Sequence, residues 1–561
     1  MEAIENQAAE MKGSLTDALQ EYFGFDKFKG EQEEIIKSVL AGEDTFVIMP
    51  TGGGKSLCYQ LPAILCEGTA IIVSPLIALM KNQVDQMRSY SSIDSIAHFL
   101  NSSLTKAQIK EVKDDLLAQK TKMLYVAPET LKKEENIELF KGIKVSFIAV
   151  DEAHCISEWG HDFRPEYRRI RDMIEAIGGD IPTVALTATA TPKVQDDIVK
   201  NLRMEDPKMF VASFLRENLY YEIRPRGKRE TVIRDLVKFV KGHQGKSGII
   251  YCLNRKTTEE LAQILNVNGV PAAPYHAGLE AAVRSKTQDM FLMEDVAVIV
   301  ATIAFGMVID KPDVRFVIHF NIPKSLENYY QETGRAGRDG LEGQCLAYYT
   351  YNDIAKLEKF LRDKPVAERE IGMQHLNEVV AYSESTACRR QFLLHYFGEK
   401  YDTGRCGNGE CDNCAFPKER QECQDEMTIA LKLVTDSKEN YGIQYLVKLL
   451  MGKKNQETLT FGHEDLESFG KGAEKDEHYW NSIFRHALLN QLLHKDIQDY
   501  GVLKMTEKGK EFLKSPFSVK VPINHNYEEL ESDVDVSTGK SAALDPTLMK
   551  MLKDIRRSVA C

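Results

Sequence analysis

Short apolar runs alternate with longer amphipathic stretches between about residues 40 and 345 of the 561-residue chain. The runs are rich in Val and Ile and are bounded by polar or glycine-containing segments, which is typical of buried strands. The pattern predicts a first series of strands at 70–73, 123–126, 145–150 and 183–186, and a second series at 247–251, 297–300 and 315–318. Because strands that alternate with helices form parallel sheets covered by helices, we expect two α/β layers.

The pattern changes on both sides of the second series. Residues 205–245 are charged and show no clear periodicity, so we expect this segment to be irregular and place a domain boundary near Ala212. Beyond Asp353 the strand pattern stops, and charged, helical sequence leads to a group of cysteines. A further helical unit ends in a hairpin-like stretch at 493–504, and an acidic, linker-like segment follows. The expected domains are 1–211, 212–350, 351–420, 421–524 and 525–561.

A glycine-rich loop follows the first apolar run, Thr45–Ile48, and precedes a helical stretch. Glycines let successive backbone N–H groups turn toward phosphate oxygens at the start of a helix. Lys55 can reach the β- and γ-phosphates of a nucleotide, and the Ser56 hydroxyl can hold Mg²⁺. Met49 stands where the full phosphate-loop pattern has its first glycine. The residues expected to contact the nucleotide here are Thr51, Gly52, Gly53, Gly54, Lys55 and Ser56.

A pair of acids ends another expected strand, Val145–Val150. In a parallel sheet, Asp151 and Glu152 would lie at the same edge as the glycine-rich loop. There Asp151 can hold Mg²⁺ through water, and Glu152 can polarise an attacking water. A solvated acidic turn is the alternative, which the upstream loop disfavours. Together the two motifs predict hydrolysis of a nucleoside triphosphate.

Composition and charge narrow the class of protein. Hydrophobic residues make up 43% of the chain, which is ordinary for globular domains, and no apolar stretch approaches the ~18 residues of a membrane span. Most of the 11 cysteines are scattered singly, there is no signal-peptide pattern and no strong basic import signal, so we expect a prokaryotic, reducing cytoplasm. The net charge of −12 argues only weakly against a nucleic-acid partner, because a binding groove needs local Lys and Arg.

Four of the cysteines form a cluster with metal-ligand spacing. Cys388, Cys406, Cys411 and Cys414 follow the pattern C-x₁₇-C-x₄-C-x₂-C, and four thiolates suit tetrahedral Zn²⁺. A set of free thiols is the alternative. His395 or Cys423 could replace one ligand, although neither suits the spacing as well. Since no reactive acid–base group accompanies the cluster, we expect a structural zinc site.

An aromatic-rich loop follows the acidic pair directly. Within residues 156–167, aromatic rings interleave with a histidine and an arginine. Aromatic faces stack on unpaired bases, each contributing ~1–3 kcal/mol, so this loop could report DNA binding to the nucleotide site. The alternative is that Trp159 and Phe163 pack between two lobes. The DNA-contact candidates in this loop are Trp159, His161, Phe163 and Arg164.

Further motifs occur in a fixed order around these sites. They lie at 23–32, 74–83, 101–103, 187–191, 251–256, 275–278, 301–312 and 331–340. Their order and content resemble those of the RecQ family of superfamily 2 DNA helicases, over residues 15 to about 520. The resemblance implies an α/β fold of two RecA-like parallel-sheet lobes, followed by a helical zinc-binding domain and a winged-helix domain.

The resemblance also assigns roles near the nucleotide. Phe25 would stack on the adenine, Gln32 would read its edge, and Lys29 stands where Arg is more usual. Asp310 would contact the ribose. The residues expected at the γ-phosphate are Gln331, Arg335 and Arg338, with Arg338 as the arginine finger.

On the DNA side, the resemblance implies contacts from Ser74, Asn101 and Thr302. Threonines in the 187–191 motif would bond the Asp151–Glu152 turn and the second lobe. Tyr500, at the tip of the expected hairpin, would wedge against a terminal base pair, with a plain surface hairpin as the alternative.

One position departs from the family pattern, because Val308 stands where glycine is usual. If the backbone there needs a positive φ, a β-branched residue strains it by ~1–3 kcal/mol. This departure leaves open a DNA-binding or annealing protein with an impaired motor. An RNA helicase is the second alternative, because RNA helicases share the core.

The main expectation is an ATP-dependent 3′-to-5′ DNA helicase that acts in recombination and repair, with ATP, Mg²⁺ and Zn²⁺ as cofactors. The direction rests on the family resemblance alone. Expected partners are single-stranded DNA, duplex DNA with a 3′ single-stranded tail and a single-strand-binding protein, without a membrane, in a bacterial cytoplasm near the nucleoid. Residues 545–557 resemble the first helix of a helicase-and-RNase-D C-terminal domain, so we expect a truncated C-terminus.

Overall fold

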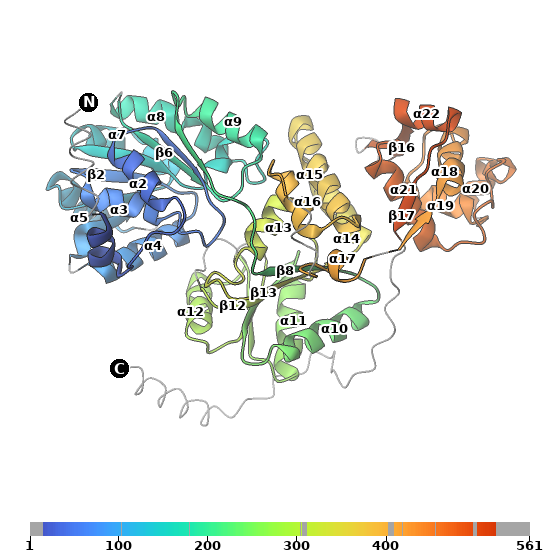
Figure 1. Ribbon diagram of the computed structural model, residues 1–561, viewed down its shortest axis with the longest axis horizontal. Coiled ribbons are helices and arrows are strands. Elements are labelled where there is room, and N and C mark those ends of the chain that lie inside the picture. Colours follow the sequence, from blue (N-terminus) through green and yellow to red (C-terminus); the bar gives the residue numbers. More distant parts are fainter. Residues whose placement is uncertain are drawn as a thin grey trace. The chain divides into compact units, whose positions relative to one another are not determined.

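The structure is a computed structural model, and it describes residues 15–522 except 92, 102–103, 179, 303–304, 306–310, 402–408, 418, 455 and 497–501 (Figure 1). The described residues form two compact units. The first contains residues up to Tyr348 and the segment that begins at Arg390. The second contains Tyr349–Arg389 and the described residues beyond position 404.

The first unit contains a seven-stranded sheet with the strand order β3-β4-β2-β5-β6-β1-β7, and neighbouring strands run parallel. Its strands are β1 (Thr45–Ile48), β2 (Thr69–Val73), β3 (Ala97–Leu100), β4 (Met123–Val126), β5 (Val145–Val150), β6 (Thr183–Thr187) and β7 (Lys208–Val211). The helices include α2 (Gln32–Leu40), α3 (Leu57–Leu65), α4 (Ile77–Tyr90), α5 (Lys106–Leu117), α8 (Ile170–Ile177) and α9 (Pro192–Asn201). The first series of predicted strands is confirmed in β2, β4, β5 and β6.

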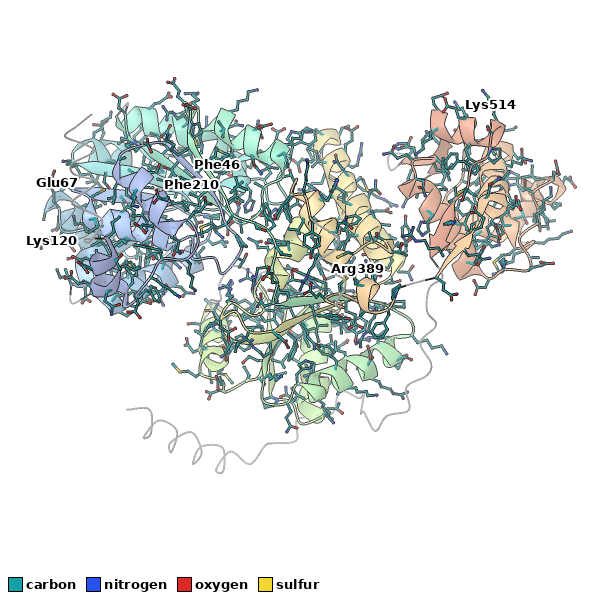
Figure 2. All side chains as sticks on the ribbon, in the orientation of Figure 1. Phe46, Glu67, Lys120, Phe210, Arg389 and Lys514 are labelled. Carbon is teal, nitrogen blue, oxygen red and sulfur yellow. The ribbon has the colours of Figure 1, made fainter. Side chains whose placement is uncertain are left out.

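Successive residues of the central strands point to opposite faces of this sheet, and each face has its own core. Phe46 of β1 belongs to one hydrophobic cluster and Val47 to the other. Phe210 of β7 packs against the second cluster, so Phe46 and Phe210 mark the two faces (Figure 2). Burial on both faces explains why these strands appear in the sequence as unbroken apolar runs.

A six-stranded sheet in the same unit has the order β10-β11-β9-β12-β13-β8. Its strands are β8 (Leu219–Pro225), β9 (Ser247–Tyr251), β10 (Ala272–Tyr275), β11 (Val298–Ala301), β12 (Val314–His319) and β13 (Gly343–Tyr349). The helices are α10 (Arg229–Gly242), α11 (Arg255–Val267), α12 (Ala281–Leu292) and α13 (Leu326–Thr333). The second predicted series is confirmed in β9, β11 and β12, and the two sheets confirm the predicted pair of parallel-sheet lobes.

The expectation that residues 205–245 are irregular is wrong. This segment contains β7, β8 and most of α10. β7 is an edge strand with mainly exposed side chains, so it lacks an apolar signature. In β8 charged side chains alternate with buried ones, and the Arg224 guanidinium pairs with Asp235 at 2.8 Å. Residues 212–218 connect the two sheets.

The second unit is mainly helical. Its helices include α14 (Tyr351–Leu361), α15 (Val366–Glu384), α17 (Asp412–Ala415), α18 (Gln424–Asp436), α19 (Ile443–Leu450), α20 (Gln456–Thr460), α21 (Glu477–Leu489) and α22 (Glu507–Lys514). The antiparallel pair β15 (Leu493–Asp496) and β16 (Val502–Met505) confirms the predicted hairpin, and β14 (Arg420–Glu422) pairs with β17 (Lys520–Pro522). The acidic segment and the helix expected at 545–557 lie outside the described residues. No helix in the described part of the chain is long and apolar enough to cross a membrane.

Candidate nucleotide, nucleic-acid and zinc sites

The phosphate loop lies between the end of β1 and the start of α3, where its conformation depends on glycine. Gly52 and Gly54 have φ values of +84° and +82°, which side chains of L-residues rarely adopt. The Lys55 ammonium donates to the Met49 carbonyl at 3.1 Å, and burial lowers the pKa of Lys55 despite the nearby acids. The loop therefore encloses its lysine where backbone N–H groups and a helix start favour an anion.

The Gln32 side chain is tied to this loop. Its amide nitrogen donates to the Gly54 carbonyl at 3.1 Å and to the Gly53 carbonyl at 3.3 Å, while its oxygen accepts from Lys29 N at 2.8 Å. The Phe25 side chain is 51% exposed, so the ring is free to meet a ligand face. Lys29 and Gln32 thus lie together beside the loop. Asp310 lies outside the described residues.

Two adjacent acids lie at the end of β5. Burial and the neighbouring Glu152 charge raise the pKa of Asp151 to about 7, although the Lys55 ammonium opposes the shift. Burial also raises the pKa of Glu152, against the charges of Lys55 and Arg335. Glu152 has a left-handed backbone, with φ 49°. Crowding two enclosed carboxylates costs free energy that a divalent cation would recover, and their oxygens are the ligands Mg²⁺ prefers. The donor set therefore fits Mg²⁺.

Thr187, at the end of β6, bonds the turn that follows these acids. Its hydroxyl lies 2.9 Å from His154 Nδ1, and the same hydroxyl accepts from Thr189 N at 3.2 Å. Burial lowers the pKa of His154 to about 4, so its ring is neutral at pH 7. The 187–191 segment thus contacts His154 in the turn that follows the acids, whereas the expected bond from this motif to the second lobe stays a prediction.

Three polar side chains of the second lobe lie close to Glu152 or to the phosphate loop. Gln331, on α13, donates to Glu152 Oε1 at 3.5 Å. Arg335 is buried and its charge acts on Glu152. Arg338 passes over the phosphate loop, because a Cβ added at Gly52 would lie 3.0 Å from Arg338 Cγ. Residues from both lobes therefore surround the loop and the acids.

The aromatic-rich loop is held by first-lobe residues in its described contacts. The Trp159 ring, 37% exposed, lies under the Lys193 ammonium, 2.9 Å from the ring centroid. Arg164 donates to the Pro75 carbonyl at 3.0 Å. The Phe163 ring lies 5.5 Å from the Arg168 guanidinium carbon. Trp159 thus keeps surface for a base, and these contacts do not favour packing between the lobes.

The remaining candidates for DNA contact are less accessible. His161 is buried and stacks on His154 with ring centroids 4.4 Å apart. Ser74 and Asn101 are buried, so a contact through their side chains would require a change of conformation. Thr302 is partly buried at the end of β11, and its backbone N donates to the Tyr275 carbonyl at 3.1 Å. Tyr500 lies outside the described residues.

Three of the four predicted zinc ligands converge. The sulfur atoms of Cys388, Cys411 and Cys414 all lie within 4.8 Å of one another, and Cys406 lies outside the described residues. Arg389 N donates to Cys411 Sγ at 3.4 Å, a bond that suits a thiolate. The buried guanidinium of Arg389, which is labelled in Figure 2, pairs with Asp412 at 2.9 and 3.1 Å. The three sulfur atoms fit Zn²⁺, whereas Cys423 Sγ lies instead 3.4 Å from the Tyr479 hydroxyl.

Three polar residues near these sites were not predicted. Arg216 and Asn218 lie in the connection between the sheets, and Lys193 lies on α9. A short Arg-x-Asn pattern in a charged segment carries no signal by itself, and a lysine at a helix start is usually a solvated residue. Their partners lie far away in the sequence, so these contacts become visible only in the folded structure, and only Arg216 contacts residues of both lobes.

Family models match nearly the whole described chain. They are a DEAD/DEAH box helicase at residues 29–198, a helicase conserved C-terminal domain at 229–340, a RecQ zinc-binding domain at 351–415 and an RQC domain at 417–529. These matches agree with the order of the two sheets, the cysteine cluster and the last helical unit.

Known proteins are similar to this chain over all or most of its length. The ATP-dependent DNA helicase RecQ of Pasteurella multocida is 39% identical over 100% of this chain and 87% of its own length. The RecQ helicase of Haemophilus influenzae is 40% identical over 91% of this chain and 82% of its own. The solved Mycobacterium smegmatis helicase Lhr bound to ssDNA and AMP-PNP shares the fold, with a TM-score of 0.51 and 16% identity over 87% of this chain and 60% of that one. The chain belongs to the RecQ family of ATP-dependent DNA helicases.

Proposed function

We propose that this chain couples ATP hydrolysis between its two lobes to movement along DNA in the 3′-to-5′ direction. It is an ATP-dependent DNA helicase that acts in recombination and repair, in line with its full-length relatives. The observation that supports the proposed site best is the convergence of Lys55, Glu152, Gln331 and Arg338 from both lobes. Such a site is complete only when the lobes are together, so hydrolysis and lobe movement are linked.

The residues around the loop divide the chemistry. Backbone N–H groups of Thr51–Ser56 and the Lys55 ammonium would hold the phosphates. Ser56 and Asp151 would hold Mg²⁺, which when bound neutralises charge on the β- and γ-phosphates. Glu152, beside Gln331, would orient and polarise the attacking water, since the two side chains already lie 3.5 Å apart.

The second-lobe arginines would stabilise the charge that develops on the γ-phosphate. Arg338 crosses the loop at Gly52, which suits the role of arginine finger, and Arg335 lies close enough to act on the Glu152 charge. Phe25, Lys29 and Gln32 would hold the adenine, and Asp310 would hold the ribose. Gln32 would also report nucleotide binding, because its amide is bonded to the phosphate loop itself.

DNA would be sensed through the aromatic-rich loop. A base that stacks on Trp159 must share the ring with the Lys193 ammonium or displace it. The resulting movement of the loop would reach Glu152 through the short chain segment between the two residues. Further contacts would come from His161, Phe163, Arg164, Ser74, Asn101, Thr302 and Tyr500. An RNA helicase remains the weaker alternative, because the full-length relatives named above are DNA helicases.

The rest of the chain would support this motor. We place domain boundaries after residues 211, 350, 420 and 524. Zn²⁺ would stabilise the fold of the third domain through Cys388, Cys411, Cys414 and Cys406. We further infer a bacterial cytoplasmic protein that works near the nucleoid, with a single-strand-binding protein as a partner.

Strand displacement tests the proposal. The full chain is mixed with ATP, Mg²⁺ and labelled duplexes that carry a 3′ tail, a 5′ tail or no tail. We expect displacement of the 3′-tailed duplex at a rate at least tenfold above the other two. Equal displacement of the 5′-tailed duplex would contradict the direction, and none with ATP on any duplex would favour the impaired-motor alternative.

A further inference from the structure

One guanidinium joins the phosphate loop to the turn that carries the second-lobe arginines. Arg216 Nη1 donates to the Thr51 carbonyl at 3.0 Å and to the Gly334 carbonyl at 3.1 Å. Its Nη2 donates to the carbonyls of Ala336 at 2.9 Å and Gly337 at 3.1 Å. Thus Arg216 holds one carbonyl of the first lobe and three of the second.

Asn218, two positions further on, shapes the same turn from the second lobe alone. Its side-chain Nδ2 donates to the carbonyls of Gly337 at 2.8 Å and Leu341 at 2.7 Å. The backbone carbonyl of Asn218 accepts from Gly343 N at 2.9 Å. Gly337 has a φ of +57°, and a Cβ added there would lie 2.3 Å from Asn218 Nδ2. The turn between Arg335 and Gly343 is therefore built around residues 216 and 218.

The segment that carries Arg216 and Asn218, residues 213–218, is called the interlobe strap below. A short stretch of chain after Arg389 holds it in place. The Glu399 carboxylate accepts from Ser213 Oγ at 2.6 Å and from Phe214 N at 2.8 Å. The Phe214 ring stacks on Phe397 with centroids 4.4 Å apart and an interplanar angle of 5°.

Three further hydrogen bonds complete this support. Arg390 Nη2 donates to the carbonyls of Glu217 at 2.7 Å and Leu219 at 3.0 Å. The Tyr330 hydroxyl, next in the chain to Gln331, donates to the Phe214 carbonyl at 2.8 Å. Arg390 follows the predicted zinc ligand Cys388 by two positions. The strap thus connects the residues after that ligand to the turn that carries the second-lobe arginines, through hydrogen bonds and aromatic stacking.

We propose that Arg216 is a positioning residue for ATP hydrolysis, and that Arg390 and Glu399 regulate this step by holding the interlobe strap. The inference rests on the proposed ATPase site. Because three of its four carbonyl partners lie on the second lobe, Arg216 travels with that lobe. The bond to the Thr51 carbonyl then forms as the lobes close and breaks as they part. A planar guanidinium with donors in a fixed fork can hold these carbonyls together, and a lysine ammonium cannot reproduce that geometry.

The test compares Arg216→Ala and Arg216→Lys with wild type in the full chain. We expect the kcat of DNA-stimulated ATP hydrolysis to fall at least tenfold in both, while KM for ATP changes less than threefold. Binding of the fluorescent nucleotide mant-ADP should stay within twofold. The tightening of mant-ADP binding on addition of beryllium fluoride should be lost, because that complex mimics the closed, γ-phosphate-bound state. Arg226→Ala, which removes an arginine packed on Phe320 in the second lobe, is the matched control and should match wild type.

The support is tested with Glu399→Gln and Arg390→Ala. Both should lower kcat at least threefold with mant-ADP binding and zinc content unchanged, measured by fluorescence and elemental analysis. If Arg216→Ala does not fold, Arg216→Lys and Glu399→Gln decide the question by the same readouts. A kcat within twofold of wild type in Arg216→Lys and Glu399→Gln would overturn the inference, as would equal weakening of mant-ADP binding with and without beryllium fluoride. Lys55→Ala distinguishes failure of this inference from failure of the proposed function. Full ATPase activity in Lys55→Ala would contradict the proposed ATPase site itself, whatever the Arg216 variants do.

Discussion

Substitution of Gly52 by alanine tests the relation between the phosphate loop and the arginine finger. Gly52 has a φ of +84°, and a residue with a Cβ is less stable in that region by ~1–2 kcal/mol. If the loop must keep this conformation, the population of the competent loop falls by a factor of roughly 5 to 30. This backbone cost applies whether the lobes are open or closed.

A second cost applies only in the closed arrangement. The added Cβ would lie 3.0 Å from Arg338 Cγ and 3.4 Å from Arg338 Cβ, whereas carbon atoms pack best at ~3.5–4.0 Å. The Arg338 side chain must then shift by a few tenths of an ångström, away from the place where it would meet the γ-phosphate. We therefore expect the kcat of Gly52→Ala to fall further than its affinity for mant-ADP.

A double-mutant cycle separates the two costs. DNA-stimulated ATP hydrolysis is measured for Gly52→Ala, Arg338→Ala and the double variant. If alanine at position 52 acts partly through Arg338, the double variant should lose less activity than the product of the single losses. Gly269→Ala is the matched control, since Gly269 has a φ of +81° with open space around it, and its kcat should stay within twofold of wild type. Strict multiplication of the two single losses would refute a contact between position 52 and Arg338.

The remaining predictions concern DNA coupling, zinc and the departure from the family pattern. Trp159→Ala should leave basal ATP hydrolysis nearly unchanged and reduce its stimulation by single-stranded DNA, whereas equal stimulation would assign Trp159 to packing. Elemental analysis should find one Zn²⁺ per chain, and Cys411→Ser should lose the metal and fold poorly, because thiolate–metal binding contributes folding free energy. Stoichiometric zinc in that variant would show that another residue is the ligand. Val308→Gly should raise DNA-stimulated ATPase and unwinding several-fold, with an opposing stability cost of ~0.5–1 kcal/mol. Unchanged or lower unwinding would mean that the backbone accommodates valine.

Much of the fold could be predicted because parallel strands buried on both faces leave unbroken apolar runs in the sequence. β4 and β5 were predicted to the residue for this reason. β7 and β8 were missed because an edge strand and a strand with paired charges lack that signature. Local motifs likewise predicted the phosphate loop and the acids at the end of β5.

Contacts between distant residues could not be predicted from local patterns. Gln331 meets Glu152 across 179 positions of the chain, and Arg216 meets Thr51 across 165. The family resemblance named Gln331, but nothing in the sequence singled out Arg216, whose four partners are all backbone carbonyls. Carbonyls are present at every residue, so bonds to them leave no compositional trace.

The central claim is that the protein hydrolyses ATP in response to DNA at a site formed by Lys55 and the second-lobe arginines. The rate of ATP hydrolysis by the Lys55→Ala variant tests this claim most directly. The measurement is kcat with and without single-stranded DNA, beside Lys110→Ala, which removes an exposed lysine of α5. We predict that wild type and Lys110→Ala are stimulated by DNA, while Lys55→Ala loses turnover and keeps its fold by circular dichroism. Activity of folded Lys55→Ala within tenfold of wild type would contradict the assignment of the phosphate loop and the account built on it.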